Sequence, residues 1–237
     1  MGSAVVIGAS GGIGRALTEQ LAATGRFDVV HGLSRKPSTW PDAVRWHRAE
    51  LTDETSLAEA AGAIAAEGEV SLVIVASGLL HGEGIAPEKT FKALDPAVMA
   101  EVFAINTIGP ALAAKHFLPL LPRRGRSVFA ALSARVGSID DNRLGGWYSY
   151  RASKAALNQI IRTLAIETRR TRPEAVLLAL HPGTVATGLS EPFRSGEPGP
   201  GHFDPGDSAA HLLRVIEGAG PEQSGGFLAW DGRPIPF

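Results

Sequence analysis

Seven short apolar segments alternate along the chain with longer segments of helical period. Most of the short segments are apolar throughout rather than at every second residue, which indicates strands buried on both faces of a sheet. They span residues 4–8, 28–33, 43–49, 70–76, 126–132, 175–181 and 227–230. Strands of this kind occur in parallel sheets that helices cover on both sides. The alternation therefore predicts a doubly wound α/β fold with a seven-stranded parallel sheet.

The longer segments carry apolar residues at i, i+3 and i+4, as amphipathic helices do. We predict helices over residues 16–24, 56–67, 95–121, 150–170 and 209–218. A chain of 237 residues suits one α/β domain, so we expect residues 1–237 to form a single domain. The Pro- and Gly-rich stretch within 188–207 is long for a connection inside a compact domain, and we interpret it as a substrate lid or a disordered loop.

Composition excludes several classes of function. The chain has no cysteine, which excludes disulfides, thiolate catalysis and Cys-ligated zinc. A net charge of −1 offers no electrostatic footprint for nucleic acid or an anionic membrane. Met1 runs directly into SAVVIG without the regions of a signal peptide, and we find no apolar stretch of the ~18 residues that a membrane span needs. We therefore expect an unprocessed, cytoplasmic protein that binds neither DNA nor membranes.

A glycine-rich turn follows the first predicted strand. The segment GASGGIG places Gly8, Gly12 and Gly14 at the start of the first helix, with Ser10 and Ile13 between them. Such a turn lets the backbone approach a pyrophosphate, and the helix N-terminus supplies unpaired N–H groups and a partial positive charge. We therefore predict that these five residues bind a dinucleotide.

The end of the second predicted strand favours one dinucleotide over the other. An NAD site uses an acidic side chain there for the ribose 2′-hydroxyl, whereas an arginine accommodates the 2′-phosphate of NADP. The chain reads GLSRKP, which supplies Arg35 and no acidic residue before Asp42. The sequence therefore predicts NADP, with NAD as the less favoured cofactor.

The segment GWYSYRASKAALN holds the chain's two tyrosines, Tyr148 and Tyr150, and Lys154. On a helix, residues four apart lie about 40° apart around the axis and residues six apart about 120°, so Lys154 shares a face with Tyr150. A positive charge ~4 Å away at an effective dielectric of ~20 would lower a phenol pKa by about three, from ~10 to near 7. We predict that Tyr150 is the general acid for carbonyl reduction and the general base for alcohol oxidation. Tyr148 and Trp147 are expected to form a pocket wall.

The GxxxGxG spacing of the glycines and the YxxxK of Tyr150 and Lys154 resemble the short-chain dehydrogenase/reductase family over essentially the whole chain. The stretches LSARVGSI and GGWYSYRASKAALN are similar to the subgroup that contains C-factor and the small carbonyl reductases. The resemblance implies a Rossmann-type fold, a dimer or tetramer, a Lys154 that also holds the nicotinamide ribose, and an Asn106 that supports a proton-relay water. It also implies cofactor contacts from Glu50 and Leu51 at the adenine, Ala76 and Gly78 at the adenosine ribose, and Pro182, Gly183 and Thr187 at the nicotinamide.

One position departs from the family pattern. The family places its catalytic serine in Ser-x-x-Gly after the fifth strand, and Ala134 stands there before Gly137. Ser133 and Ser138 flank this motif, and a local shift could restore a hydroxyl. We favour Ser133 as the catalytic serine, although strand alternation argues against it. If neither serine reaches the substrate, stabilisation of its oxygen falls to Tyr150 alone and turnover should be slow.

The sequence as a whole predicts an NADP-dependent oxidoreductase that transfers a hydride between nicotinamide and a carbonyl or secondary alcohol. A nucleotide-binding signalling or regulatory protein on the same scaffold is the alternative, which the altered serine motif favours and the retained Tyr150, Lys154 and Asn106 oppose. An epimerase or dehydratase with YxxxK would need a longer C-terminal substrate domain. The seven histidines show no spacing suited to metal ligation, so no metal site is predicted.

Overall fold

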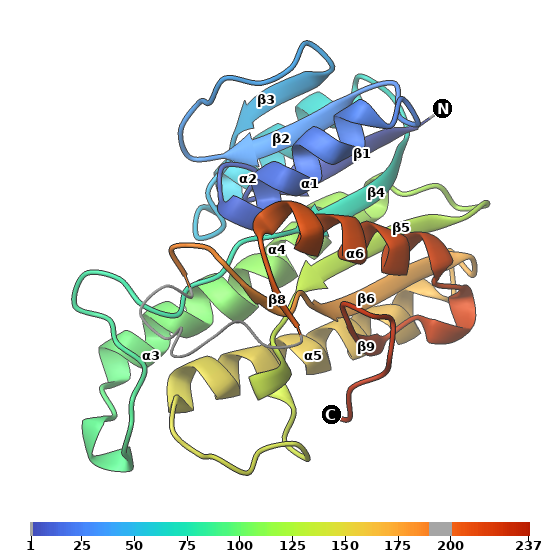
Figure 1. Ribbon diagram of the computed structural model, residues 1–237. Coiled ribbons are helices and arrows are strands. Elements are labelled where there is room, and N and C mark those ends of the chain that lie inside the picture. Colours follow the sequence, from blue (N-terminus) through green and yellow to red (C-terminus); the bar gives the residue numbers. More distant parts are fainter. Residues whose placement is uncertain (1, 190–200) are drawn as a thin grey trace.

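The structure, a computed structural model, describes residues 2–189 and 201–237. Seven parallel strands form one sheet in the order β3-β2-β1-β4-β5-β6-β9 (Figure 1). They are β1 (Ser3–Ile7), β2 (Val30–Ser34), β3 (Val44–Arg48), β4 (Val70–Val75), β5 (Ser127–Leu132), β6 (Ala175–His181) and β9 (Gly226–Ala229). The predicted doubly wound sheet and its seven strands are confirmed, in a single domain that takes up the chain.

Two helical layers cover the two faces of the sheet, so alternate residues of each central strand are buried in different cores. Val5 and Ile7 join one core, with side chains of α2 (Glu54–Ala65), α4 (Gly109–Phe117) and α5 (Tyr148–Thr168). Ala4 and Val6 join the other, with α1 (Gly12–Ala23) and α6 (Pro205–Gly218), which lie side by side in Figure 1. Burial of β1 on both faces thus explains why its sequence is apolar throughout.

The predicted helix over 95–121 is continuous but not uniform. It consists of α3 (Pro96–Phe103), a π-helical turn (Ala104–Ile108), α4 and a 3₁₀ turn (Leu118–Leu120). Within Pro96–Leu120 a window of 18 residues has a mean hydropathy of 1.5, so by length and composition this helix could cross a membrane, which corrects the prediction that no stretch reaches that length. In the structure α3 and α4 pack against α5, and Ala113, Ala114 and Phe117 are fully buried in the core.

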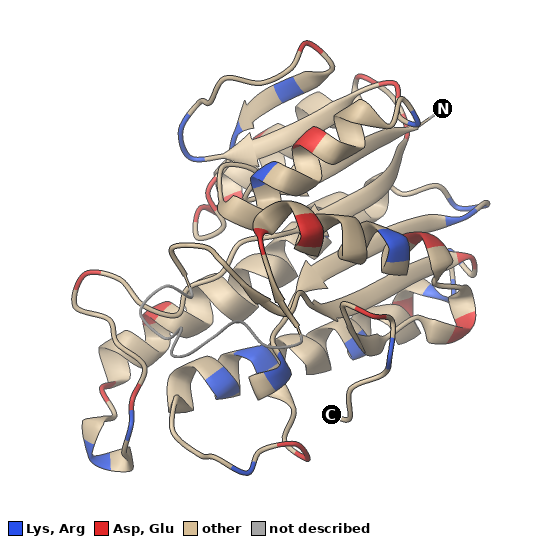
Figure 2. Ribbon diagram, viewed as in Figure 1, with Lys and Arg blue, Asp and Glu red and all other residues tan. Residues whose placement is uncertain are grey.

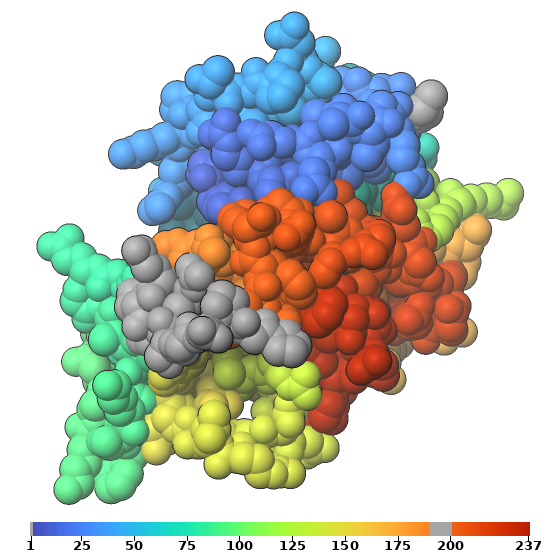
Figure 3. All heavy atoms as spheres, viewed as in Figure 1, coloured from blue at the N-terminus to red at the C-terminus, as the bar shows by residue number. Residues whose placement is uncertain are grey.

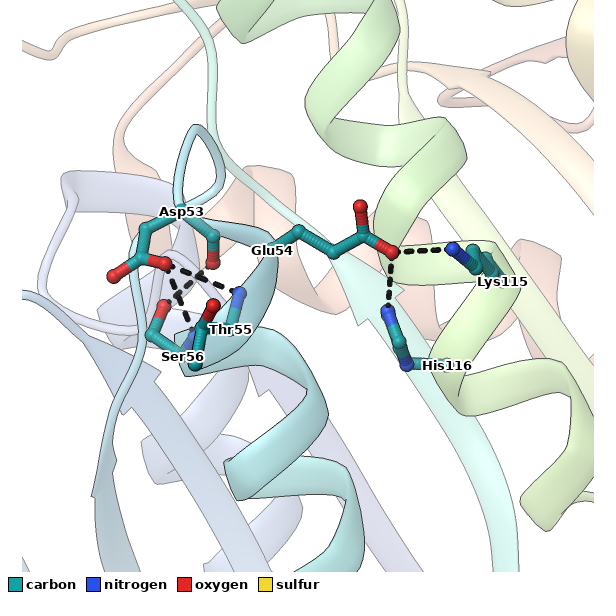
Figure 4. A network of polar contacts seen from close by, with 6 residues as sticks. All are labelled: Asp53, Glu54, Thr55, Ser56, Lys115 and His116. Carbon is teal, nitrogen blue, oxygen red and sulfur yellow. Dashed lines mark hydrogen bonds and ion pairs between the residues drawn. The ribbon is translucent and has the colours of Figure 1, made fainter.

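A polar network fixes α2 against α4 (Figure 4). The Asp53 carboxylate caps α2 by accepting the N–H groups of Thr55 (3.1 Å) and Ser56 (3.3 Å). The neighbouring Glu54 carboxylate binds Lys115 and, at 3.1 Å, Nε2 of His116. The hydrogen bond from Lys115 and then that from His116 hold the pKa of Glu54 below its usual value. These exposed contacts supplement the packing of α4 in the core, where Ala113, Ala114 and Phe117 are fully buried.

A second, two-stranded parallel ladder was not predicted. β7 (Thr184–Val185) pairs with β8 (His202–Phe203), and α6 begins soon afterwards at Pro205 with Asp204 as its N-cap. Within the predicted lid over 188–207, His202–Phe203 form β8 and α6 begins at Pro205, so the stretch is not one irregular loop. Its role as a lid stays a prediction. Residues 190–200 of that lid lie outside the described part of the chain. Figure 2 shows Lys and Arg interspersed with Asp and Glu over the visible elements.

Candidate active site

The turn from β1 into α1 has a shape that two of its glycines make possible. Gly8 adopts a left-handed conformation (φ 86°), and its N–H donates to Leu33 O at 2.9 Å. A Cβ on Gly14 would lie 2.1 Å from Gly8 O, so only glycine lets α1 start against the turn. The N-cap of α1 is Gly11, whose lack of a side chain leaves the first N–H groups of the helix available to a ligand.

A cleft of about 550 Å³ opens from this turn across the carboxyl ends of the neighbouring strands. Ile7 pairs with Leu33 of β2 and Val75 of β4, so these strands end level with one another. The chain reverses its strand order between β1 and β4, and ligands of doubly wound sheets bind at such a point. Ten predicted cofactor residues line the cleft: Gly8, Ser10, Gly12, Ile13, Arg35, Glu50, Leu51, Ala76, Gly78 and Thr187.

Several residues of the cleft were missed from the sequence. They include Ser34, Ser77, Thr52, Leu79, Glu101 and Ile105. Ser34 Oγ donates to Lys36 O at 2.7 Å and accepts Trp46 Nε1–H at 2.9 Å, so it supports the turn that carries Arg35. Its position directly before Arg35 was the signal that could have found it. The exposed Arg35 side chain makes no hydrogen bond or ion pair within residues 2–189 and 201–237, which leaves its donors to a ligand.

Five other residues predicted to bind the cofactor lie outside the cleft lining, namely Gly14, Pro182, Gly183, Tyr150 and Lys154. Gly14 is buried against Gly8 and acts on the cleft through the backbone alone. Pro182 O accepts Ser208 Oγ–H at 2.8 Å, and a Cβ on Gly183 would lie 2.8 Å from the Phe203 ring. Pro182 and Gly183 therefore shape the turn between β6 and the β7–β8 ladder, while Thr187 beyond them approaches Gly12.

Tyr150 and Lys154 lie together at the start of α5, as their spacing predicts. Tyr150 is 7% exposed and Lys154 2%, and Nζ of Lys154 lies 5.9 Å from the centroid of the Tyr150 ring. Lys154 Nζ also donates to Leu132 O at 2.8 Å. Tyr148 is 37% exposed, and the Trp147 ring meets the Tyr150 ring edge-on at 6.2 Å. The helical register thus separates the two tyrosines as expected.

Gly78 joins this pair to the cleft. It lines the cleft, and a Cβ added to it would lie 3.6 Å from both Nζ of Lys154 and Oδ1 of Asn106. A ligand that extends along the cleft past Gly78 therefore reaches the side chains of Lys154 and Asn106.

The electrostatics of the pair differ from the prediction. Burial raises the pKa of the Tyr150 phenol above its ordinary value of 10 and lowers the pKa of Lys154 to about 7. The expectation of a phenol pKa near 7 is therefore wrong for the chain alone. It assumed a full positive charge on Lys154, whereas loss of hydration disfavours both the ammonium and the phenolate at these positions.

Asn106 sits in the π-helical turn and is fully buried. Its Nδ2 donates to Leu79 O at 2.8 Å and to Ser153 Oγ at 3.2 Å, and its Oδ1 accepts Leu79 N–H at 2.8 Å. π-helical turns are frequent at functional sites. The π-helical turn places the buried Asn106 amide between α5 and the loop after β4, near Lys154.

Ser133, the predicted catalytic serine, does not line the cleft. It is 4% exposed, and its hydroxyl donates to Asn158 Oδ1 at 2.6 Å. Like Phe129 and Ala131 it points toward α5, because side chains alternate along β5. Ser138 is also buried, and its Oγ accepts Asp141 N–H at 3.1 Å. The structure thus places the Ser133 hydroxyl between β5 and α5, where Asn158 accepts its hydrogen bond, and its role as the catalytic serine stays a prediction.

His31, His47 and Glu67 form a cluster that the sequence did not reveal. Their potential metal-ligating atoms all lie within 4.8 Å of one another, because the two histidines lie on adjacent strands. Nδ1 of His31 lies 3.0 Å from Nε2 of His47, and Glu67 pairs with the cation of Arg45. Burial is the largest of the effects that lower the pKa of His31 to about 4. Each member thus has a partner within the protein, and we assign no ion to the cluster.

Comparison with known proteins places this geometry in a family. A model of the short chain dehydrogenase family matches residues 3–198. C-signal of Myxococcus xanthus is 39% identical over 145 residues, which cover 61% of this chain and 81% of that protein. The 1-hydroxy-2-glutathionyl-2-methyl-3-butene dehydrogenase of Rhodococcus sp. (strain AD45) is 32% identical over 243 residues, 98% of each chain. The crystal structure of NADPH-bound carbonyl reductase from chicken fatty liver matches with a TM-score of 0.86 at 25% identity, over 99% of this chain and 94% of that one.

The fold and the site together define a nucleotide-binding oxidoreductase scaffold. The chain belongs to the short-chain dehydrogenase/reductase family, as its glycine and tyrosine motifs indicated.

Proposed function

We propose that the protein is an NADP-dependent carbonyl reductase that also catalyses the reverse oxidation of secondary alcohols. The observation that carries this proposal is the position of Gly78, which lines the nucleotide cleft and lies beside Lys154 and Asn106. The resemblance to an NADPH-bound carbonyl reductase supports the same reaction class. A cofactor in the cleft would thus end next to a proton donor.

The residues of the cleft fit a dinucleotide. The glycine turn leaves backbone N–H groups of α1 free for a pyrophosphate. Arg35 is exposed at the rim and would pair with a 2′-phosphate, since a guanidinium binds phosphate oxygens through paired N–H groups. Lys154 would hold the nicotinamide ribose.

In the reduction, the carbonyl carbon would accept a hydride, which NADPH would supply when bound. Tyr150 donates its phenolic proton to the carbonyl oxygen, as the raised pKa of the buried phenol keeps it protonated at neutral pH. Asn106 fixes the loop after β4 against α5 through Leu79 and Ser153. Ala134 supplies no hydroxyl to the substrate oxygen, so we expect slower turnover than a site with a serine there would give.

Oxidation of NADPH in the presence of a panel of aldehydes and ketones tests the proposal. We expect turnover with at least one carbonyl compound, and loss of it in the Tyr150→Phe variant. Ala134 is the observation that favours the alternative, a nucleotide-binding regulatory protein. Tight NADPH binding without turnover of any carbonyl or alcohol would support that alternative instead.

A further inference from the structure

The segment between β4 and α3 reaches the start of α5 through Glu88. This segment extends from the body of the protein beside α3 (Figures 1 and 3). Glu88 is only 5% exposed. Its backbone O accepts Trp147 N–H at 2.5 Å, its Oε2 accepts Ser149 N–H at 3.2 Å, and its Oε1 accepts the Ser149 hydroxyl. All hydrogen bonds that Glu88 makes within the described residues thus go to the N-terminus of α5.

The start of α5 has no cap of its own. The N-cap is Trp147, whose indole cannot accept a hydrogen bond, so it gives the helix no side-chain cap. Trp147 is also left-handed (φ 53°), alone in this among the non-glycine residues described, and it follows two left-handed glycines, Gly145 and Gly146. A strained conformation of this kind persists only where the surroundings hold it. Glu88 contacts Trp147 and Ser149, the residues on both sides of Tyr148, and so keeps Trp147 in this conformation.

Tyr150 lies in the same first turn as Ser149. Within the helix, this turn is closed by Arg151 N–H donating to Trp147 O at 2.8 Å. Helix ends open more readily than helix centres, and a displacement of ~1 Å at a reacting group can cost ~100-fold in rate. We infer that Glu88 is a positioning residue that caps α5 from a distant segment and thereby fixes Tyr150 and Trp147 at the substrate site. For catalysis this inference rests on the proposed function.

Three variants of the whole chain test the inference. Glu88→Ala removes the carboxylate, whereas Glu88→Gln keeps an oxygen for Ser149 N–H and an amide that can donate to the Ser149 hydroxyl. Glu83→Gln is the matched control, because Glu83 is an exposed glutamate of the same segment. We expect kcat to fall about 10- to 100-fold in Glu88→Ala and only a few-fold in Glu88→Gln. In all three variants the dissociation constant of NADPH should stay within about twofold of that of the unmodified protein, because neither Glu88 nor Glu83 lines the cleft. The kcat of Glu83→Gln should also stay within about twofold.

Hydrogen exchange separates this inference from the proposed function. In Glu88→Ala the Ser149 amide should exchange at least about tenfold faster, while amides of β5 and β6 keep their protection. Unchanged exchange at Ser149, or an unchanged kcat, would overturn the inference. If the unmodified protein turns over no carbonyl compound, the proposed function fails, and the exchange of Ser149 still decides whether Glu88 caps the helix. If Glu88→Ala does not fold, Ser149→Ala provides a second test, because it removes only the hydroxyl contact with Glu88. We expect the kcat of Ser149→Ala to be lower than that of the unmodified protein. A kcat equal to that of the unmodified protein would count against the inference.

Discussion

Replacement of Tyr150 by phenylalanine removes the proposed proton donor and little else. The Tyr150 side chain is 7% exposed, and its hydroxyl has no hydrogen-bond partner in the described part of the chain. Its loss therefore leaves no buried group unsatisfied, and we expect the free energy of unfolding to change by less than about 1 kcal/mol. General acid catalysis contributes ~10²- to 10⁴-fold, so the barrier to the chemical step should rise by about 3 to 5 kcal/mol. Steady-state oxidation of NADPH with one active carbonyl substrate measures kcat, and fluorescence titration measures NADPH affinity.

Tyr148→Phe is the matched control. Tyr148 is 37% exposed and its hydroxyl lies off the face of α5 that carries Lys154, so the variant should keep proton transfer and change only substrate preference. An active Tyr150→Phe together with an inactive Tyr148→Phe would refute the helical-register argument. If both variants keep full activity, the protein does not use this chemistry.

Three further predictions concern the cofactor and the serine motif. Arg35→Asp should weaken NADPH binding by about 100-fold or more while NADH binding changes little, because a carboxylate replaces the guanidinium proposed to bind the 2′-phosphate. If the unmodified protein binds NADH more tightly than NADPH, Arg35 does not select NADP. Ala134→Ser should raise kcat about tenfold or more, since it adds a donor for the substrate oxygen. Ser133→Ala should leave kcat unchanged and lower the free energy of unfolding by about 1–3 kcal/mol, because the buried Asn158 Oδ1 loses its partner; an inactive Ser133→Ala would restore Ser133 as a catalytic residue.

The sheet could be predicted because its cause is local. The central strands β1, β4, β5 and β6 are apolar runs that two cores bury, and the observed ends of all seven strands lie within two residues of those predicted. The β7–β8 ladder could not be predicted in this way, since each of its strands has only two residues. The π-helical turn at Asn106 was not predicted, because a one-residue insertion appears in sequence only as a phase shift between two apolar patterns, and α3 and α4, with 8 and 9 residues, are too short to reveal that shift.

The nucleotide end of the site was more predictable than the substrate end, for a physical reason. The cleft depends on backbone shape at Gly8 and Gly14, which a glycine pattern reveals directly. The substrate end depends on side chains that meet across long separations in sequence, such as Glu88 with Ser149. Nothing at Glu88 in the sequence distinguishes it from the exposed Glu83 nearby, so its role follows only from the three-dimensional contacts.

The burial of Lys154 gives the site a cost in stability that depends on pH. Lys154 Nζ donates to Leu132 O, and its pKa falls from 10.5 to about 7 because burial disfavours the ammonium. Between these two values the unfolded chain holds the proton and the folded chain does not, so stability rises with pH. The contribution is up to about 1.4 kcal/mol per pH unit.

Urea unfolding of the cofactor-free protein from pH 7 to 9.5 tests this linkage. We expect the free energy of unfolding to rise with pH in the unmodified protein relative to Lys154→Met, in which the titrating amine is absent. Lys154→Met should also be the more stable of the two at pH 7, although it should be inactive, because the amine that the reaction needs is the one that folding disfavours. Parallel pH dependence in the two proteins would mean that Lys154 titrates at its ordinary pKa in the folded state, and the argument for a buried amine beside Tyr150 would then fail.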